Sequence, residues 1–346
     1  MELSDLRIGC LAQGEFRRLA PHTGAFEAFY DYGITFDRIV GGSAGAIMGA
    51  AVSPWTKRNF NHVREVVLGL TSKKIFTIPL EHKASGLLAA GALSFPLINH
   101  LEPNMRLSAK VGLHVLQSLG GLALGADTVR RIFSAKSLFD NSPLEHLLNA
   151  TYDFEGIRKA RTEVRIMATD VETGEHVAFS TKEDGLTLSA LVGYVIASAT
   201  LPVYFPLRRI GGRLLTDAEV KTNFPIGQLE DMDLVFVLHY TDGTGDRRIP
   251  RTWGDHYNAM FDIAKAEINT QAVEQFEARR RNGERLPEVV FIRTARRVPP
   301  LTMDAFSRSA LERSIALGYE MVCENEALIG NAIGRTMERV EALGHR

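Results

Sequence analysis

The stretch that most constrains the fold of this chain is residues 39–49, which read Ile-Val-Gly-Gly-Ser-Ala-Gly-Ala-Ile-Met-Gly. An apolar run leads into Gly41 and Gly42, Ser43 follows, and small residues with helical character begin around Gly45. In a strand–turn–helix context, G-x-S-x-G forms a nucleophile elbow, a tight turn that exposes a serine hydroxyl to substrate. Ser43 is therefore a candidate nucleophile. A glycine-rich turn without chemistry is the alternative, because short matches to this pattern arise often by chance.

The elements around this turn alternate between strand and helix. Leu6–Leu11 and Phe36–Val40 are predicted to be buried strands, and Ala20–Tyr32 and Ala44–Val52 have helical spacing. This order within the first fifty or so residues predicts an α/β domain with a parallel sheet. Near the other end of the chain, Arg308–Leu328 is predicted to be a final amphipathic helix.

The early position of the elbow argues against a histidine triad. Only 42 residues precede Ser43, whereas the serine of an ordinary α/β-hydrolase follows several strands and is completed by a late histidine. His239 and His256 are late enough to be candidates. His239 ends an apolar run typical of a strand, and His256 lies in a polar, helix-like segment, so neither is expected to be a catalytic base.

The composition excludes several classes of protein. The chain has 40 basic and 41 acidic residues among its 346, a formal net charge of −1, so we expect no nucleic-acid partner. Cys10 and Cys323 are the only cysteines, which excludes a disulfide framework, and Cys10 is expected to be buried. The ten histidines show no H-x-x-x-H or H-E-x-x-H spacing. We therefore expect neither a metal nor a cofactor.

One α/β domain over residues 1–346 is the simplest organisation, with a helical insertion at 56–140 and a C-terminal helical part at 250–346. Within the insertion, Leu87–Leu101 and Val111–Ala126 are apolar, yet they are too short and too interrupted to cross a bilayer. Two interpretations are open. These segments are either buried helices or a cap of mobile, lipid-contacting helices over the serine.

The cellular location is predicted from targeting and membrane-spanning patterns that the sequence lacks. The first residues do not have the charged and apolar regions of a signal peptide, and no stretch offers ~20 uninterrupted apolar residues. The prediction is a cytoplasmic protein, with peripheral contact at a membrane surface as a further option. The sequence does not predict an oligomeric state.

A second stretch with residues suited to catalysis is 214–226, which contains Asp217 and the pattern Asn223-x-Pro225. A strand is predicted to end at Thr216, so Asp217 begins the following turn. A carboxylate placed there can accept a proton from a serine hydroxyl directly, with no histidine between them. The alternative is a turn-capping aspartate, which is common.

Three motifs together resemble the patatin-like phospholipases: Gly41–Gly45, Ala197–Pro202, and Asp217 with Asn223-x-Pro225. Members of that family use a Ser–Asp dyad, with G-x-S-x-G near the N-terminus and D-G-[AG] roughly 150–200 residues later. The similarity spans about Leu6 to Leu229, in the family's order and spacing. It implies a three-layer α/β/α fold with a largely parallel central sheet.

The resemblance also implies hydrolysis of lipid acyl esters. Ser43 is expected to attack the ester carbonyl with Asp217 as its base, which gives an acyl-enzyme that water resolves. The N–H group of Ala44 is one expected donor to the oxyanion. An acyltransferase or thioesterase, and a catalytically weak protein that binds a lipid or a partner, are the alternative functions.

Two parts of the pattern depart from the family. The family's glycine-rich loop, of the form G-G-G-x-[KR]-G, falls on Gly14-Glu15-Phe16-Arg17-Arg18-Leu19. Only Gly14 and Arg18 match, and Glu15 and Phe16 replace glycines that turn backbone N–H groups towards the substrate. The residue after Asp217 is alanine where the family has glycine. We therefore predict an intact dyad beside an altered loop for oxyanion and substrate binding.

Overall fold

The computed structural model describes residues 2–77, 137, 139–202, 204–222, 224–240, 253–294, 296, 298 and 306–344, with the backbone alone for 253–266. The two apolar stretches of the predicted insertion, Leu87–Leu101 and Val111–Ala126, lie outside the described residues, as does Asn223. The two interpretations of the insertion therefore stay open.

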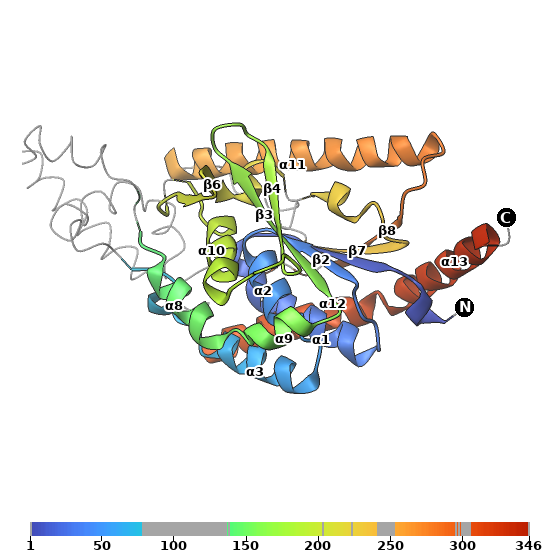
Figure 1. Cartoon of the computed structure of the whole chain (residues 1–346), viewed down its shortest axis with the longest axis horizontal. Helices are drawn as coiled ribbons and strands as arrows, with labels where there is room; N and C mark the ends of the chain where they lie inside the picture. Colours follow the sequence, from blue (N-terminus) through green and yellow to red (C-terminus); the bar gives the residue numbers. More distant parts are fainter. Residues whose placement is uncertain are drawn as a thin grey trace, which may run out of the picture.

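The centre of the molecule is a single β-sheet (Figure 1). Its described strands are β1 (Ile8–Ala12), β2 (Arg38–Gly41), β3 (Glu163–Asp170), β4 (His176–Ser180), β5 (Arg208–Ile210), β6 (Arg213–Asp217), β7 (Leu234–Tyr240) and β8 (Glu288–Thr294). The order is β5-β6-β3-β2-β1-β7-β8, and β4 also pairs with β3. All neighbours from β3 to β8 in this order run parallel, whereas β4, β5 and β6 pair antiparallel. The predicted, largely parallel sheet is confirmed.

Helices cover both faces of this sheet. The described helices are α1 (Leu19–Asp31), α2 (Ala44–Val52), α3 (Lys57–Leu68), α8 (Ser142–Thr151), α9 (Phe154–Lys159), α10 (Leu188–Ser198), α11 (Trp253–Arg281), α12 (Arg308–Glu324) and α13 (Glu326–Gly344). Single 3₁₀ turns are η1 (Leu3–Asp5), η2 (Phe16–Arg18), η3 (Ser72–Lys74), η5 (Ala218–Val220) and η6 (Ile226–Leu229). Figure 1 shows α1, α2, α3 and α12 on one face and α11 on the other. None of the described helices combines the length and apolar character needed to cross a bilayer.

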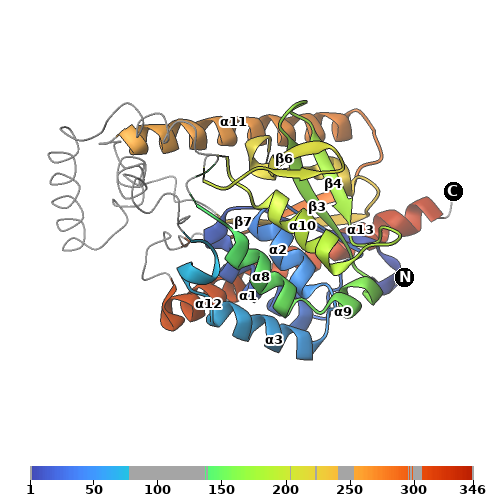
Figure 2. The ribbon, with the colours of Figure 1, turned by 60° about the vertical axis from the view of Figure 1, so that its left-hand side comes forward.

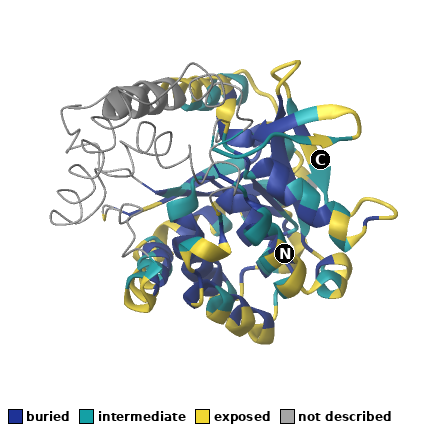
Figure 3. Cartoon of the chain, turned by 90° about the vertical axis from the view of Figure 1, so that its left-hand side faces the viewer, coloured by how far each residue is buried: buried dark blue, intermediate teal, exposed yellow. Residues whose placement is uncertain are grey.

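The central strands β1 and β7 are buried on both faces, and Figure 3 shows the centre of the sheet in the colour of buried residues. On β1, Cys10 faces the core formed with α1, α2 and α12, whereas Leu11 belongs to the cluster that contains Phe276 of α11. On β7, Phe236 and Val237 divide in the same way. Two covered faces explain why these strands read as continuous apolar runs. The three-layer α/β/α fold is confirmed, and so is the burial of Cys10.

The last predicted helix, Arg308–Leu328, is wrong in one respect, because the structure has two helices there. Asn325 separates α12 from α13, and its side-chain amide donates to the carbonyl oxygens of Met321 (2.8 Å) and Arg293 (2.7 Å). These bonds satisfy the end of α12 and tie it to β8. The part at 250–346 also contains β8, where the sequence predicts a strand at Val289–Arg293.

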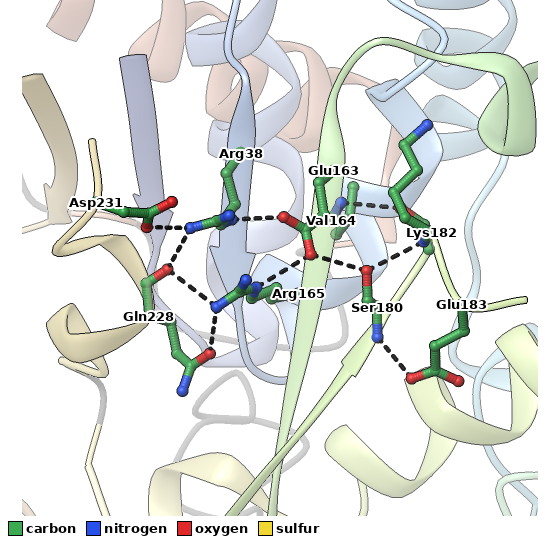
Figure 4. A network of polar contacts seen from close by, with 10 residues as sticks. Arg38, Glu163, Val164, Arg165, Ser180, Lys182, Glu183, Gln228 and Asp231 are labelled. Carbon is green, nitrogen blue, oxygen red and sulfur yellow. Dashed lines mark hydrogen bonds and ion pairs between the residues drawn. The ribbon is translucent and has the colours of Figure 1, made fainter. Parts of the chain in front are cut away.

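A network of polar side chains joins the amino ends of β2 and β3, at the end of these strands opposite the elbow (Figure 4). Arg38 donates to Oε2 of Glu163 at 2.6 Å and also pairs with Asp231. The other oxygen of Glu163 accepts hydrogen bonds from Arg165 at 3.1 Å and from Ser180 of β4 at 2.8 Å. One carboxylate thus links three neighbouring strands.

Replacing Glu163 by glutamine is expected to lower the free energy of unfolding by about 1–3 kcal/mol near neutral pH, because the hydrogen bonds to a charged acceptor are lost. Burial raises the pKa of Glu163 from its ordinary 4.5. The hydrogen bonds from Arg38, Ser180 and Arg165 lower it by more than burial raises it, so the net pKa is below 4.5. Because the folded-state pKa is the lower one, this stabilisation is present above the unfolded-state pKa and is lost as the pH falls through the folded-state value. Urea unfolding at several pH values measures the difference.

Glu155→Gln is the control, because it removes only exposed ion pairs with Arg158 and Lys159 on α9. It should change the free energy of unfolding by less than about 0.5 kcal/mol. A difference between wild type and Glu163→Gln that stays constant from neutral to acidic pH would show that the carboxylate is not favoured in its charged form.

Candidate active site

The elbow lies at the carboxyl end of β2, where the chain turns into α2. Ser43 precedes the first residue of α2 and adopts φ 50° and ψ −122°, in the left-handed region that residues other than glycine rarely occupy. A Cβ on Gly45 would lie 2.0 Å from the carbonyl oxygen of Ala12, and one on Gly41 would lie 2.5 Å from the carbonyl carbon of Gly45. Both glycines are therefore required. Strain at a serine held this way is typical of a functional site.

Asp217 ends β6 and is fully buried, with 0% of its surface exposed. Because β2 and β6 pair with opposite sides of β3, their ends lie near one another. The two turns touch, since a Cβ on Gly42 would lie 2.6 Å from the Cβ of Ala218. Ala218 does not adopt a positive φ, so alanine fits without strain where the family has glycine. The structure thus brings the turn that holds Ser43 against the turn that holds Asp217.

Asp217 also has a structural role. Its Oδ1 accepts a hydrogen bond from the backbone N–H of Glu219 at 2.8 Å, which caps the short turn η5. The interpretation as a turn-capping residue is therefore correct for one of its two oxygens. This capping bond restrains the carboxylate, and a restrained carboxylate is also what a catalytic base requires.

The end of α10 and the residues that follow it support both turns. The N–H of Ser43 donates to the carbonyl oxygen of Ser198 at 3.1 Å and to its Oγ at 2.9 Å. The carbonyl oxygen of Thr200 accepts from the N–H of Asp217 at 2.9 Å and from the hydroxyl of Thr216 at 2.8 Å. The segment Ala197–Pro202, quoted above only for the resemblance, is thus a common support that fixes the two turns relative to each other.

Among the residues that the structure describes, no acceptor is found for two backbone N–H groups near Ser43. Ala44 is the first residue of α2, and Gly14 follows β1, whose end packs against Gly45. Both residues are buried, and within the described part of the chain neither N–H group meets a hydrogen-bond acceptor. Buried N–H groups are rarely left this way, so they could serve as donors to an oxyanion. The N-terminal end of α2 adds a favourable potential for negative charge.

A carboxylate that the sequence did not single out lies against the loop. Glu219 is 4% exposed, and a Cβ on Gly14 would lie 2.0 Å from its Oε1, so any other residue at position 14 would displace this side chain. Arg18 is also buried, and its Nη1 donates to the side-chain oxygen of Gln13 at 3.0 Å. Charged groups of both signs therefore lie at this end of the sheet. The only signal for Glu219 was its position two residues after Asp217.

Glu15 shows how the altered loop is accommodated. It adopts φ 82° and ψ 118°, the kind of conformation for which the family's glycine is suited. Its carboxylate forms ion pairs with Arg17 and with Arg18, the latter with Oε2 and Nη2 3.0 Å apart. A carboxylate near the oxyanion would repel its negative charge. The guanidinium groups of Arg17 and Arg18 offset the charge of Glu15. The ring of Phe16 lies beside that of Phe306, with 6.0 Å between ring centres.

Beside the loop, His22 and Tyr240 form a buried polar pair that sequence reasoning missed. His22 is 0% exposed, with Nε2 2.7 Å from the carbonyl oxygen of Gln13 and Nδ1 3.2 Å from the hydroxyl of Tyr240. Burial lowers the pKa of His22 to about 3; the hydrogen bond to Gln13 opposes this shift and Arg18 adds to it. Burial also raises the pKa of Tyr240 well above its ordinary value. The tyrosine therefore donates to Nδ1, and Nε2–H donates to Gln13.

The two candidate histidines lie on β7 and on α11. His239 lies near the end of β7, with its ring 6.0 Å from that of Phe291. His256 lies in α11, and its side chain is not among those described. No three metal-binding side chains cluster in the part of the chain that the structure covers.

Comparisons with known proteins place the chain in a wider group. A family model described as patatin-like phospholipase matches residues 17–230, more than half of the 346 residues. The crystal structure of VipD from Legionella pneumophila aligns with a TM-score of 0.45 and 16% sequence identity, over 92% of this chain. The chain spans 66% of the length of that VipD chain. No curated protein sequence matches it.

Proposed function

The chain belongs to the patatin-like phospholipase family, and from this premise we propose that it hydrolyses acyl esters of lipids with Ser43 as nucleophile and Asp217 as base. The observation that carries the proposal is the contact of the two turns, Gly42 against Ala218, with one turn hydrogen-bonded to Ser198 at the end of α10 and the other to Thr200 just after it. The substrates we propose are phospholipids or lysophospholipids. Since these lie in membranes, the proposal includes contact with a membrane surface.

The reaction begins when Oγ of Ser43 attacks the ester carbonyl carbon while its proton passes to Asp217. The carbonyl oxygen becomes an oxyanion, to which the N–H groups of Ala44 and Gly14 donate. Collapse of the tetrahedral intermediate breaks the ester bond, and the alcohol leaves with the proton held by Asp217. Water then attacks the acyl-enzyme, Asp217 takes its proton, and Ser43 recovers a proton as the fatty acid leaves.

Two alternatives share parts of this site. Transfer of the acyl group to an acceptor other than water, or its removal from a thioester, uses the same acyl-enzyme. A protein that binds lipid with little catalysis is favoured by one observation, the replacement of loop glycines by Glu15 and Phe16. The ion pairs of Glu15 with Arg17 and Arg18 reduce the force of that observation.

Covalent labelling tests the proposal directly. A fluorophosphonate probe should label the folded protein, because an activated serine attacks phosphorus as it attacks an ester carbonyl. Mass spectrometry of the digested protein should locate the adduct on Ser43. The label should be absent from heat-unfolded protein and from Ser43→Ala.

Ser53→Ala is the matched control, because Ser53 is buried at the other end of α2 and donates to the carbonyl oxygen of Ala50. This variant should be labelled like wild type. A folded wild-type protein that takes no label and hydrolyses no ester would overturn the proposal and favour the lipid-binding alternative.

A further inference from the structure

A buried glutamate links the turn of the proposed base to the altered loop. Glu219 lies in η5, two residues after Asp217. The family's pattern D-G-[AG] has glycine or alanine at that position, whereas this chain has a long, charged side chain there and buries it. A side chain of this size must be accommodated by its neighbours, because protein interiors are closely packed.

The side chain of Glu219 lies over the backbone of Gly14. A Cβ on Gly14 would lie 2.0 Å from Oε1, 2.8 Å from Cδ and 2.9 Å from Cγ of Glu219. Three atoms of one side chain thus fill the space where a Cβ on Gly14 would stand. Gly14 does not adopt a positive φ, so an alanine there would be opposed by this contact and not by the backbone conformation.

The position of Glu219 is fixed through the proposed base. Oδ1 of Asp217 accepts a hydrogen bond from the N–H of Glu219 at 2.8 Å, and Ala218, between them, packs against Gly42 of the elbow. The elbow is held in turn by the end of α10, which lies beside α2 (Figure 2). The base and the residue that covers the loop therefore belong to one short, restrained turn.

Other contacts hold the loop just before Gly14. A Cβ on Gly45 of the elbow would lie 3.1 Å from the carbonyl oxygen of Gln13, and Nε2 of His22 lies 2.7 Å from the same oxygen. Glu219 instead packs on Gly14 itself. Glycine has more backbone freedom than any other residue, so an uncovered Gly14 would be the point at which the loop moves most easily.

We propose that Glu219 is a positioning residue, which holds Gly14 where its N–H can donate to the oxyanion; this role rests on the hydrolytic function proposed above. The side chain acts by filling space over Gly14, so its shape matters more than its charge. The oxyanion forms only after Ser43 attacks, so a displaced Gly14 slows the reaction with little effect on ester binding. In this chain a single turn thus sets both the base and one oxyanion donor.

Two substitutions separate the shape of Glu219 from its charge. Glu219→Ala should lower kcat for p-nitrophenyl butyrate about 10- to 100-fold, because a misplacement of about 1 Å in an active site has an effect of this size. KM should change by less than about 3-fold. Glu219→Gln keeps the shape and should recover most of the lost kcat. Glu219→Asp, one methylene shorter, replaces Glu219→Ala in the comparison if that variant does not fold.

Glu230→Ala is the matched control. Glu230 is a half-buried glutamate that also lies beside a glycine, with Oε1 3.8 Å from where a Cβ on Gly227 would be. It follows η6, a turn that contacts the amino end of β2 through the bond from Arg38 to Gln228, away from the elbow. This variant should keep the kcat of wild type.

A second substitution tests the contact itself. Gly14→Ala alone should lower kcat about 10- to 100-fold, because the new methyl group displaces the side chain of Glu219 and shifts the loop. In Glu219→Ala the same methyl group has room. The double variant should therefore be no slower than Glu219→Ala, whereas the losses of independent substitutions would multiply.

The outcomes distinguish this role from the hydrolytic function. If fluorophosphonate labels Ser43 but folded Glu219→Ala has the kcat of wild type, the positioning role is overturned and hydrolysis stands. Equal losses of kcat in Glu219→Ala and Glu219→Gln, or losses that multiply in the double variant, would overturn the role as well. If wild type takes no label and hydrolyses no ester, the hydrolytic function fails, and the positioning role fails with it.

Discussion

Replacing Asp217 by asparagine is expected to lower kcat for a lipid ester about 10²–10⁴-fold, because an amide cannot accept the proton of Ser43. Ser43→Ala should lower kcat further, since no acyl-enzyme can form. The two groups act as one unit, so the double variant should be no slower than Ser43→Ala alone. Initial rates of the four proteins with one soluble ester measure these effects.

The capping bond of Asp217 makes the choice of substitution important. Asparagine keeps an oxygen that can accept from the N–H of Glu219, so the turn should survive and the melting temperature should stay near that of wild type. Asp170→Asn is the matched control, because Asp170 ends β3, is buried, and accepts from the N–H of Glu172 at 2.9 Å in the same way. This control should keep its activity. If Asp217→Asn had the kcat of wild type, Asp217 would only cap the turn η5 and would not be the catalytic base.

The fold could be predicted from sequence wherever one local pattern decided the outcome. The alternation of apolar runs with segments of helical spacing predicted the parallel strands. The covered faces of β1 and β7 show why those runs are apolar throughout. The elbow could be predicted because its glycines are required by contacts a few residues away, such as that of Gly41 with Gly45. Both cases depend on short-range geometry.

Residues that act through long-range contacts left no such signal. Glu219 matters because it lies on Gly14, and Ser198 because it accepts from the N–H of Ser43, although both pairs are far apart in sequence. The break at Asn325 was missed for a similar reason, since the amide that separates the two helices also bonds to Arg293 on β8. Periodicity reports which face of a helix is apolar, not which carbonyl a side chain reaches across the fold.

His22 is the clearest case, because it lies inside a correctly predicted helix and yet reaches the altered loop. The peptide between Gln13 and Gly14 is trans and planar, so the carbonyl of Gln13 and the N–H of Gly14 point in opposite directions. By donating to that carbonyl at 2.7 Å, His22 fixes the direction of the N–H proposed as an oxyanion donor. This bond offers a reason why the loop can work although Glu15 and Phe16 replace its glycines.

His22→Leu is therefore expected to lower kcat by about 10²–10³-fold, the effect of losing one oxyanion donor, with a much smaller change in KM. His22→Gln should recover most of this loss, because its amide N–H can reach the carbonyl oxygen of Gln13. Tyr240→Phe should cost less than His22→Leu, since it removes only the donor to Nδ1. Steady-state kinetics of the three variants, each checked for its melting temperature, give the comparison.

Comparing the pH dependence of stability with kcat in His22→Gln separates the titration of this buried imidazole from its positioning role. Burial holds the pKa of His22 at about 3 in the folded protein, against an ordinary 6.5, so the folded state binds fewer protons than the unfolded state between these values. The stability that neutral His22 contributes is present above about pH 6.5 and declines as the pH falls towards 3. His22→Gln has no such group, so its unfolding should be less sensitive to acid while its kcat stays near wild type. Equal losses of kcat in the glutamine and leucine variants would instead mean that His22 supports the fold and not the direction of the Gly14 N–H.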